Sequence, residues 1–153
     1  MKRNLEPSCC LGTAVATHLL SKYSDMDNCG LVLMAPFNNM SDVIYLHPWT
    51  WPWRLLLPKS MFTWIFSPMT EINFQPDQHI QNIETPILML HSTDDAVINI
   101  NLAKHLFDAK MTKVSKDKHH VQFIELIKPY GHSEIYKAKE LPGLLSKFNE
   151  FCA

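Results

Sequence analysis

Two short, unbroken apolar runs most constrain the fold of this 153-residue chain. Residues 30–35 read Gly-Leu-Val-Leu-Met-Ala and are stopped by Pro36, and residues 87–91 read Ile-Leu-Met-Leu-His directly after Pro86. Runs of this length and composition are typical of strands that are buried on both faces of a parallel sheet. Because such a sheet needs helices on its faces, the runs predict an α/β fold.

The segments around these runs supply the other elements of that fold. Residues 11–23 carry apolar side chains at three- and four-residue steps, which predicts an amphipathic helix. A second helix is expected over residues 102–111, a third strand over residues 121–127, and a last helix from near Pro142 to the end. We expect the three strands to be parallel neighbours connected through the helices.

A long insertion, from about residue 37 to residue 83, separates the first two strands. It holds all four tryptophans and five of the ten prolines, without a sustained period of either 2 or 3.6 residues, so it is predicted to be loop-rich. Prolines and charges break residues 43–66, which argues against a membrane span. Two interpretations stay open for it: a lid with an exposed aromatic surface that contacts acyl chains or a membrane surface, or ordinary cover for the core.

Composition narrows the possible partners. Hydrophobic residues make up 46% and charged residues 19%, which is the balance of a globular protein with ample core material. A formal net charge of −1 does not favour nucleic acid as a partner. The four cysteines lack paired spacing and the eight histidines lack a carboxylate at ligand spacing, so we expect no disulfide framework, no metal and no cofactor.

Polar residues with catalytic potential follow two of the predicted strands. Asp95 comes after one strand and His132 after the next, and in α/β sheets ligands bind beyond the carboxyl ends of the strands. Either residue alone is more often structural, as a turn aspartate or a surface histidine. Together they favour a pair in which the carboxylate holds the imidazole while its other nitrogen takes a proton from a nucleophile. Acid before histidine is also the chain order of hydrolases with a nucleophile elbow.

Four segments carry a resemblance to a known family. In their order and spacing they resemble the α/β-hydrolase-domain-containing protein 12 family over nearly the whole chain from Cys10 onward. The segments are Cys-Leu-Gly-Thr-Ala-Val-Ala-Thr at 10–17, Ala-Pro-Phe-Asn-Asn at 35–39, Leu-His-Ser-Thr-Asp-Asp-Ala-Val-Ile at 90–98, and His-Ser-Glu-Ile-Tyr-Lys at 132–137 with Glu-Leu-Pro at 140–142. The resemblance implies the C-terminal part of an α/β-hydrolase fold and the activity of lysophosphatidylserine and monoacylglycerol lipases anchored in the endoplasmic reticulum membrane.

The resemblance also implies roles for individual residues. The triad acid falls on Asp95 rather than Asp94, and the triad base falls on His132. Where the family has Gly-x-Ser-x-Gly, this chain reads Ser-Cys-Cys-Leu-Gly at 8–12, so Cys10 stands at the nucleophile position. A thiol can act as nucleophile when a histidine takes its proton, and the backbone N–H of Leu11 is then the expected oxyanion donor.

Only nine residues precede Cys10, so residues 1–10 are interpreted as a divergent or truncated N-terminus and residues 11–153 as the C-terminal part of the domain. We therefore expect a sheet with an open apolar edge, a Cys10 that is not held at attack distance, and weak or no activity. Neither a secretory signal nor a membrane span is visible. Two hypotheses remain: a lipase-type hydrolase of lysophospholipid or monoacylglycerol esters, and an inactive remnant that binds lipid or a protein partner.

Overall fold

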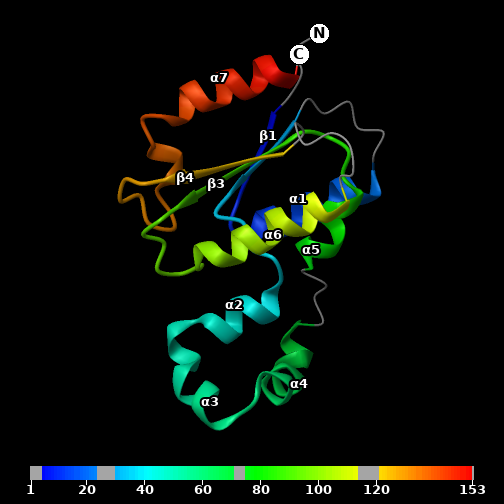
Figure 1. Cartoon of the computed structure of the whole chain (residues 1–153), viewed down its shortest axis with the longest axis vertical. Helices are drawn as coiled ribbons and strands as arrows, with labels where there is room; N and C mark the ends of the chain where they lie inside the picture. Colours follow the sequence, from blue (N-terminus) through cyan, green and yellow to red (C-terminus); the bar gives the residue numbers. More distant parts are fainter. Residues whose placement is uncertain (1–4, 24–29, 71–74, 114–120, 153) are drawn as a thin grey trace.

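A computed structural model describes residues 5–23, 30–70, 75–113 and 121–152. The described residues form a four-stranded parallel sheet in the order β1-β2-β3-β4, with helices on both faces (Figure 1). The strands are β1 (Leu5–Cys9), β2 (Gly30–Met34), β3 (Ile87–Ser92) and β4 (Val121–Leu126). The three predicted strands are thus confirmed as parallel neighbours, and the chain has part of an α/β-hydrolase fold.

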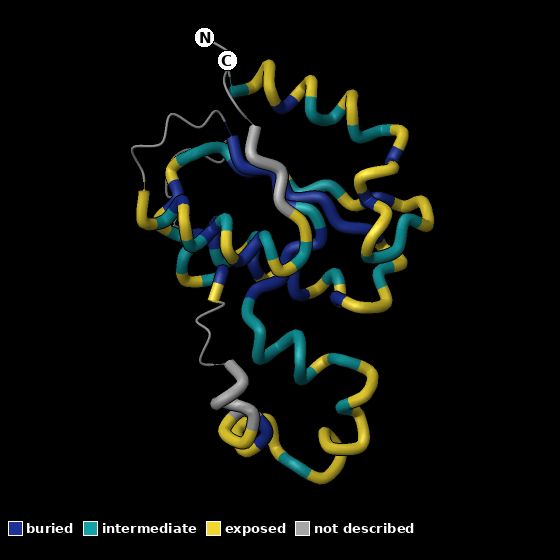
Figure 2. Tube along the Cα trace, turned by 180° about the vertical axis from the view of Figure 1, so that it is seen from behind, coloured by how far each residue is buried: buried dark blue, intermediate teal, exposed yellow. Residues whose placement is uncertain are grey.

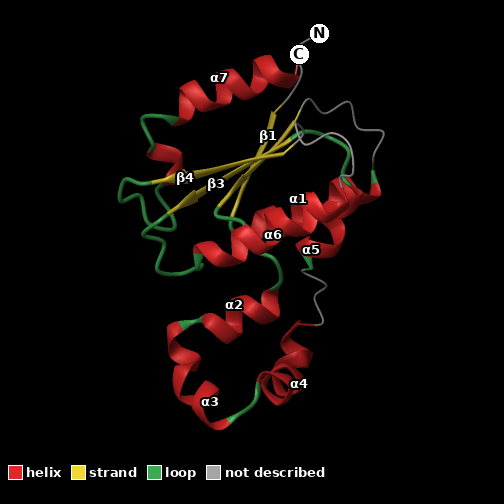
Figure 3. Cartoon of the chain, in the orientation of Figure 1, coloured by secondary structure: helices red, strands yellow, loops and turns green. Residues whose placement is uncertain are grey.

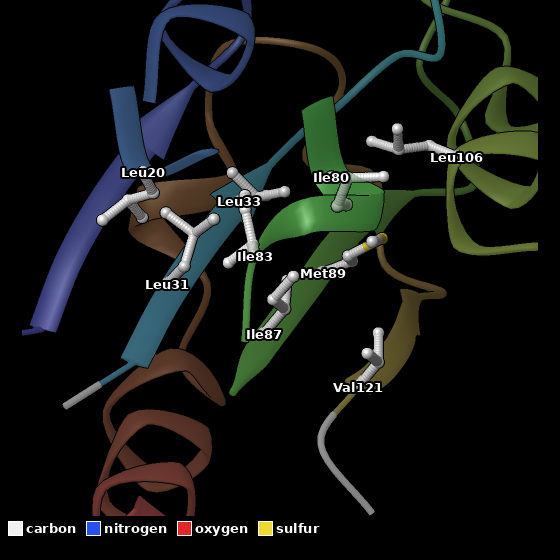
Figure 4. Close-up of a cluster of buried hydrophobic side chains, with 9 residues drawn as sticks. All are labelled: Leu20, Leu31, Leu33, Ile80, Ile83, Ile87, Met89, Leu106 and Val121. Atoms are coloured by element: carbon white, nitrogen blue, oxygen red, sulfur yellow. The ribbon is translucent and has the colours of Figure 1, made fainter. Parts of the chain in front are cut away.

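The alternating side chains of the central strands build one core on each face of the sheet. Leu31 and Leu33 of β2 belong to a cluster on one face, whereas Val32 belongs to the cluster on the other face, and all three are fully buried. This alternation follows from the two-residue period of a strand. Figure 4 shows the first cluster, which consists of Leu20, Leu31, Leu33, Ile80, Ile83, Ile87, Met89, Leu106 and Val121.

Helices cover the two faces unequally. One face carries α1 (Leu11–Lys22), α6 (Ile100–Lys113), and the short α5 (Pro76–His79) with the 3₁₀ turn Ile80–Asn82, while α7 (Leu141–Cys152) lies on the other (Figures 1 and 3). A further 3₁₀ turn, Ile135–Lys137, lies between β4 and α7. The three predicted helices are present close to their expected bounds. On this framework the carboxyl ends of all four strands meet at one edge of the sheet.

Strand β1 is an element that the sequence did not predict. Leu5 pairs with Gly30 and Cys9 with Met34, so the strand runs parallel to β2 along its whole length. Its residues, Leu-Glu-Pro-Ser-Cys, have low strand propensity, and Pro7 has no N–H to donate to a ladder. The expected boundary after residue 10 falls between this strand and α1, the helix that follows it. The expectation of a three-stranded sheet was wrong, because β1 adds a fourth strand.

The insertion is helical rather than loop-rich, so that prediction was wrong. It contains α2 (Met40–Leu46), the 3₁₀ turn Pro48–Thr50, α3 (Trp51–Leu56) and α4 (Lys59–Thr70), which together stand apart from the sheet (Figure 1). We call residues 40–70 the lobe. Two of its prolines lie at helix starts, where the missing N–H of proline has no intrahelical partner to lose: Pro48 opens the 3₁₀ turn and Pro52 lies in the first turn of α3. A proline near a helix start is therefore compatible with the helix, although it also resembles a helix breaker in the sequence.

Much of the lobe is exposed (Figure 2). Trp49 is 86% exposed, Trp64 is 77% exposed and Leu55 is 82% exposed, whereas Phe62 is buried. These tryptophans therefore do not cover the core, which was one of the two interpretations of the insertion. None of the helices in the described ranges is both long enough and apolar enough to cross a bilayer.

Gly30 offers a test of how tightly α7 packs on β2. A Cβ at this position would lie 2.6 Å from Phe148 Cε1 and 2.9 Å from Cys152 Sγ. We expect Gly30→Ala to lower the free energy of unfolding by about 1–3 kcal/mol, because overpacking displaces the ring. Urea denaturation measures the change, with Gly143→Ala as the control because no atom lies within 4 Å of a Cβ there. Phe148→Leu should restore part of the loss, and equal stability of Gly30→Ala and the parent would contradict this packing.

Candidate active site

Cys10 sits on a sharp turn between β1 and α1. Its backbone has φ 50° and ψ −122°, a conformation that L-residues rarely adopt and that costs about 1–3 kcal/mol. Hydrogen bonds hold the turn: Cys10 N–H donates to the Met34 carbonyl at 3.0 Å, and both the N–H and the hydroxyl of Thr13 donate to the Cys10 carbonyl. A strained strand-turn-helix of this kind presents its central side chain above the sheet edge, as a nucleophile elbow does.

Asp95 is held in a tight turn after β3. Its Oδ1 accepts the backbone N–H groups of Val97 at 2.8 Å and Ile98 at 2.9 Å, and its side chain is fully buried. These two bonds leave Oδ2 free to face the next strand end. The turn thus fixes both the position and the direction of the carboxylate.

The loop after β4 carries His132 and is fastened at several points. Gly131 has φ +55°, which only glycine adopts without strain, and its N–H donates to Asp94 Oδ1 at 3.0 Å. On the other side of the loop, Tyr130 donates its hydroxyl to Glu140 Oε2 at 2.7 Å. The hydrogen bond and charge of Lys128, with that hydroxyl, lower the pKa of Glu140 to about 2.

The three predicted side chains, Cys10, His132 and Asp95, are in contact one after another. His132 Nδ1 lies 2.8 Å from Asp95 Oδ2, and His132 Nε2 lies 3.0 Å from Cys10 Sγ. Since a carboxylate only accepts, Nδ1 carries the proton and Nε2 is the nitrogen that faces the thiol. The predicted contact between Asp95 and His132 is therefore present. The expectation that Cys10 would be misplaced was wrong, because β1 supplies the strand that supports the elbow.

The thiol itself is in its neutral form. Burial raises the pKa of Cys10, the Leu11 N–H hydrogen bond lowers it, and the negative Asp95 raises it further, with a net rise. A raised pKa leaves little thiolate at neutral pH, so the sulfur needs a base to take its proton before it can act as a nucleophile. The Leu11 N–H points to the sulfur at the start of α1, which is where an oxyanion donor is expected.

An apolar wall adjoins the nucleophile. Cys10 packs against a cluster whose buried members are Ala14, Phe37, Ile98 and Leu102, with Met40 and Val43 at its margin. Met40 and Val43 belong to α2, so the wall connects the sheet edge to the first helix of the lobe. Cys10 therefore lies between the polar side chains of His132 and Asp95 and a mostly buried apolar cluster, of which Met40 and Val43 are partly exposed.

Sequence reasoning missed two residues of this site. Asp94 was considered only as a rival to Asp95, yet it accepts the Ser92 hydroxyl and the Gly131 N–H and so connects the β3 end to the His132 loop. His91 was read as a strand residue, but its buried ring lies beside Asp95. The two adjacent aspartates after β3 were a sequence signal for Asp94. No sequence signal indicated His91, because its contact with the Asp95 turn depends on the tertiary structure.

Solved structures similar to this chain are esterases and other α/β hydrolases. The esterase domain of a Rhodothermus marinus protein matches 97% of the chain with a TM-score of 0.63 and 14% identity, and the chain covers 61% of that structure. An esterase from Pyrococcus furiosus matches 97% with a TM-score of 0.64 and 15% identity, and the chain covers 53% of it. No protein-family model matches the chain. The chain has the α/β-hydrolase fold.

Within that class, the chain is similar in sequence to proteins named lysophosphatidylserine lipase ABHD12. It is 35% identical to the Danio rerio protein and 33% identical to the Rattus norvegicus protein, over 145 residues and 90% of the chain in both. The family resemblance predicted from the sequence is thereby confirmed. The chain spans 37% and 36% of the length of these two relatives.

Asp94 provides a test of the loop that carries His132. Asp94→Ala removes the acceptor for the Gly131 N–H, so His132 should lose its fixed distance to Cys10. We expect acylation of Cys10 by p-nitrophenyl acetate at pH 7 to slow by up to about 10²-fold, the cost of a displacement of about 1 Å. Asp94→Asn, which keeps an oxygen acceptor, is the matched control and should lose much less. Equal rates for Asp94→Ala and the parent would show that the loop does not need this bond.

Proposed function

We propose that this chain transfers the acyl group of lysophospholipid or monoacylglycerol esters to Cys10 and then to water. The observation that carries the proposal is the unbroken line from Cys10 through His132 to Asp95, with contacts of 3.0 Å and 2.8 Å. A nucleophile, a base and a group that orients the base are the parts that covalent acyl transfer requires.

In the first half-reaction the Cys10 sulfur attacks the ester carbonyl carbon. A C–S bond forms, the thiol proton passes to His132 Nε2, and the carbonyl oxygen takes up negative charge near the Leu11 N–H. Because the thiol is neutral at rest, the proton leaves as the sulfur attacks, as it does from a serine hydroxyl. Collapse breaks the C–O bond, and His132 returns the proton to the departing alcohol.

In the second half-reaction water replaces the alcohol. His132 Nε2 takes a proton from water, the resulting oxygen nucleophile attacks the thioester carbon, and the C–S bond breaks. The thiolate that leaves recovers its proton from His132, and a fatty acid is released. Throughout both halves Asp95 keeps the imidazole in one orientation and stabilises its charged form.

Support for a lipid substrate comes from two sides. Met40 and Val43, which are partly exposed beside Cys10, would contact an acyl chain. The relatives are named lysophosphatidylserine lipases, which supports an ester of this kind, although the match spans little over a third of them. We expect slow turnover, since Leu11 is the oxyanion donor identified among the described residues and loss of one of two donors costs about 10²–10³.

The test uses the purified 153-residue chain with 1-oleoylglycerol and with an oleoyl lysophosphatidylserine. We expect slow release of oleate that Cys10→Ala and His132→Ala abolish, while Cys9→Ala retains it as the matched thiol control. Cys10→Ser should not raise the rate, because the oxyanion donors are unchanged. Intact-mass measurement should detect an acyl group on Cys10. Oleate release that persists in Cys10→Ala would overturn the proposed chemistry.

A second candidate function is attachment of the lobe to a membrane surface. Exposed tryptophan and leucine side chains crowd α3 and its neighbours. The formal charges of residues 40–70 are Asp42, Arg54 and Lys59, and since Asp42 pairs with Lys59, the lobe has a net charge of +1. Tryptophan is favoured at the interface of a bilayer, and cations are attracted to anionic lipids. We propose that the lobe delivers the site to lipid; the endoplasmic reticulum, implied by the family resemblance, stays a prediction.

Vesicle binding tests the lobe separately from the chemistry. We expect sedimentation with phosphatidylcholine vesicles containing phosphatidylserine, and about tenfold weaker partition for the double variant Trp49→Ala and Leu55→Ser, since about 1.4 kcal/mol of lost apolar burial is tenfold in binding. Ile127→Ser is the matched control, because Ile127 is 86% exposed on the sheet body against 82% for Leu55. A chain that binds vesicles through the lobe but releases no oleate would favour the binding role alone. Equal binding by the parent, the double variant and Ile127→Ser would refute the membrane role of the lobe.

A further inference from the structure

His91 lies beside the proposed triad without touching either the nucleophile or the base. It is the fifth residue of β3, its ring is fully buried, and its Nε2 lies 3.0 Å from the Ile98 carbonyl oxygen. The same nitrogen lies 3.5 Å from Asp95 Oδ2. The ring therefore sits beneath the turn that holds the triad acid.

The hydrogen bond decides which tautomer His91 adopts. A carbonyl oxygen only accepts, so Nε2 must carry the proton and Nδ1 must carry the lone pair. Nδ1 is buried and has no hydrogen-bond partner among the described residues. Burial also lowers the pKa of His91, which keeps the ring neutral.

A buried nitrogen without a partner is unfavourable, and an apolar side chain at position 91 would avoid it. What the imidazole provides instead is the bond to Ile98. The N–H of Ile98 donates to Asp95 Oδ1 and its carbonyl accepts from His91, so the backbone of Ile98 is held by a hydrogen bond on each side of its Cα. A chain of contacts thus runs from His91 through Ile98 and Asp95 to His132.

We propose that His91 is a positioning residue that locks the Asp95 turn, so that the carboxylate faces His132 and holds its Nδ1 proton toward itself. This role rests on the proposed function, since it serves the reaction at Cys10. A neutral ring matters because His91 and His132 both face Oδ2. A cationic His91 would compete with His132 for the same carboxylate oxygen.

The charges around His91 fit this assignment. Asp95 and His132 face it from the two neighbouring strand ends, and Glu125 lies opposite it across the β3–β4 pairing. Glu125 is already paired with Lys104 of α6 at 2.8 Å. Burial has the largest effect on the pKa of His91 and lowers it. The Ile98 carbonyl, Asp95 and Glu125 raise that pKa, but burial together with His132 gives a net lowering.

The first test examines the unmodified protein. Nitrogen-15 chemical shifts of the His91 ring should report a neutral Nε2–H tautomer at pH 7, and the His132 Nδ1 proton should appear as a downfield resonance. His91→Leu should abolish the downfield resonance, whereas His91→Gln, whose amide nitrogen can reach the Ile98 carbonyl, should retain it. An Nδ1–H tautomer of His91, or a resonance that persists in His91→Leu, would overturn the proposal.

The second test measures acylation of Cys10 by p-nitrophenyl acetate from pH 5 to pH 10 in a Cys9→Ala background. In the parent, the plot of acylation rate against pH should have two parts. The rate near neutral pH (the neutral limb) should be lost in His132→Ala, and the rise at alkaline pH (the alkaline limb) should come from the thiolate. His91→Leu should lower the neutral limb by up to about 10²-fold and keep the alkaline limb, and His91→Gln should keep both. If His91→Leu fails to fold, His91→Met replaces it.

The outcomes separate the two ideas. If the parent lacks the neutral limb, the proposed function is contradicted. The His132 Nδ1 resonance would then still test whether His91 positions Asp95. A neutral limb that is equal in the parent and in His91→Leu refutes the role of His91 and leaves the proposed function standing. An equal loss in His91→Leu and His91→Gln would also refute it, because the shared hydrogen bond would then not be the cause.

Discussion

The parallel pairing of four strands is the constraint on which the rest of the structure depends. Because all strands run the same way, their carboxyl ends meet at one edge. Cys10 follows β1, Asp95 follows β3 and His132 follows β4. Cys10 and His132 are 122 positions apart in sequence, and they come within hydrogen-bond distance because their strands end at the same edge of the sheet. The buried runs of β2 and β3 make this pairing stable, since each contributes to a core on both faces.

Position and protonation together set the chemistry of the site. The elbow holds Cys10 in a strained conformation, and three backbone and side-chain hydrogen bonds offset that strain. Burial keeps the thiol neutral, so the sulfur depends on His132 in the way that a serine hydroxyl would. The thiol thus lies at the turn between β1 and α1, within hydrogen-bond distance of His132.

The lobe buries fewer of its apolar side chains than the sheet does. Its helices are joined by an ion pair between Asp42 and Lys59 at 2.8 Å and by the edge-to-face contact of Tyr45 with the buried Phe62. Most of its large apolar side chains lie outside this small core. A surface of that kind is costly in water and favourable at a lipid interface. The apolar cluster beside Cys10 includes Met40 and Val43 of α2, so the first helix of the lobe packs next to the site.

The sequence by itself determined the α/β alternation and the contact between Asp95 and His132, since unbroken apolar runs and the polar residues after them are local signals. It did not reveal β1, because Glu6 and Pro7 disguise a strand that only pairing with β2 stabilises. The sequence also did not reveal that the lobe is helical, because prolines that lie at helix starts resemble prolines that break helices. Only the tertiary structure placed Cys10 against His132 and His91 beneath Asp95, because both contacts depend on strands that are distant in sequence and adjacent in space.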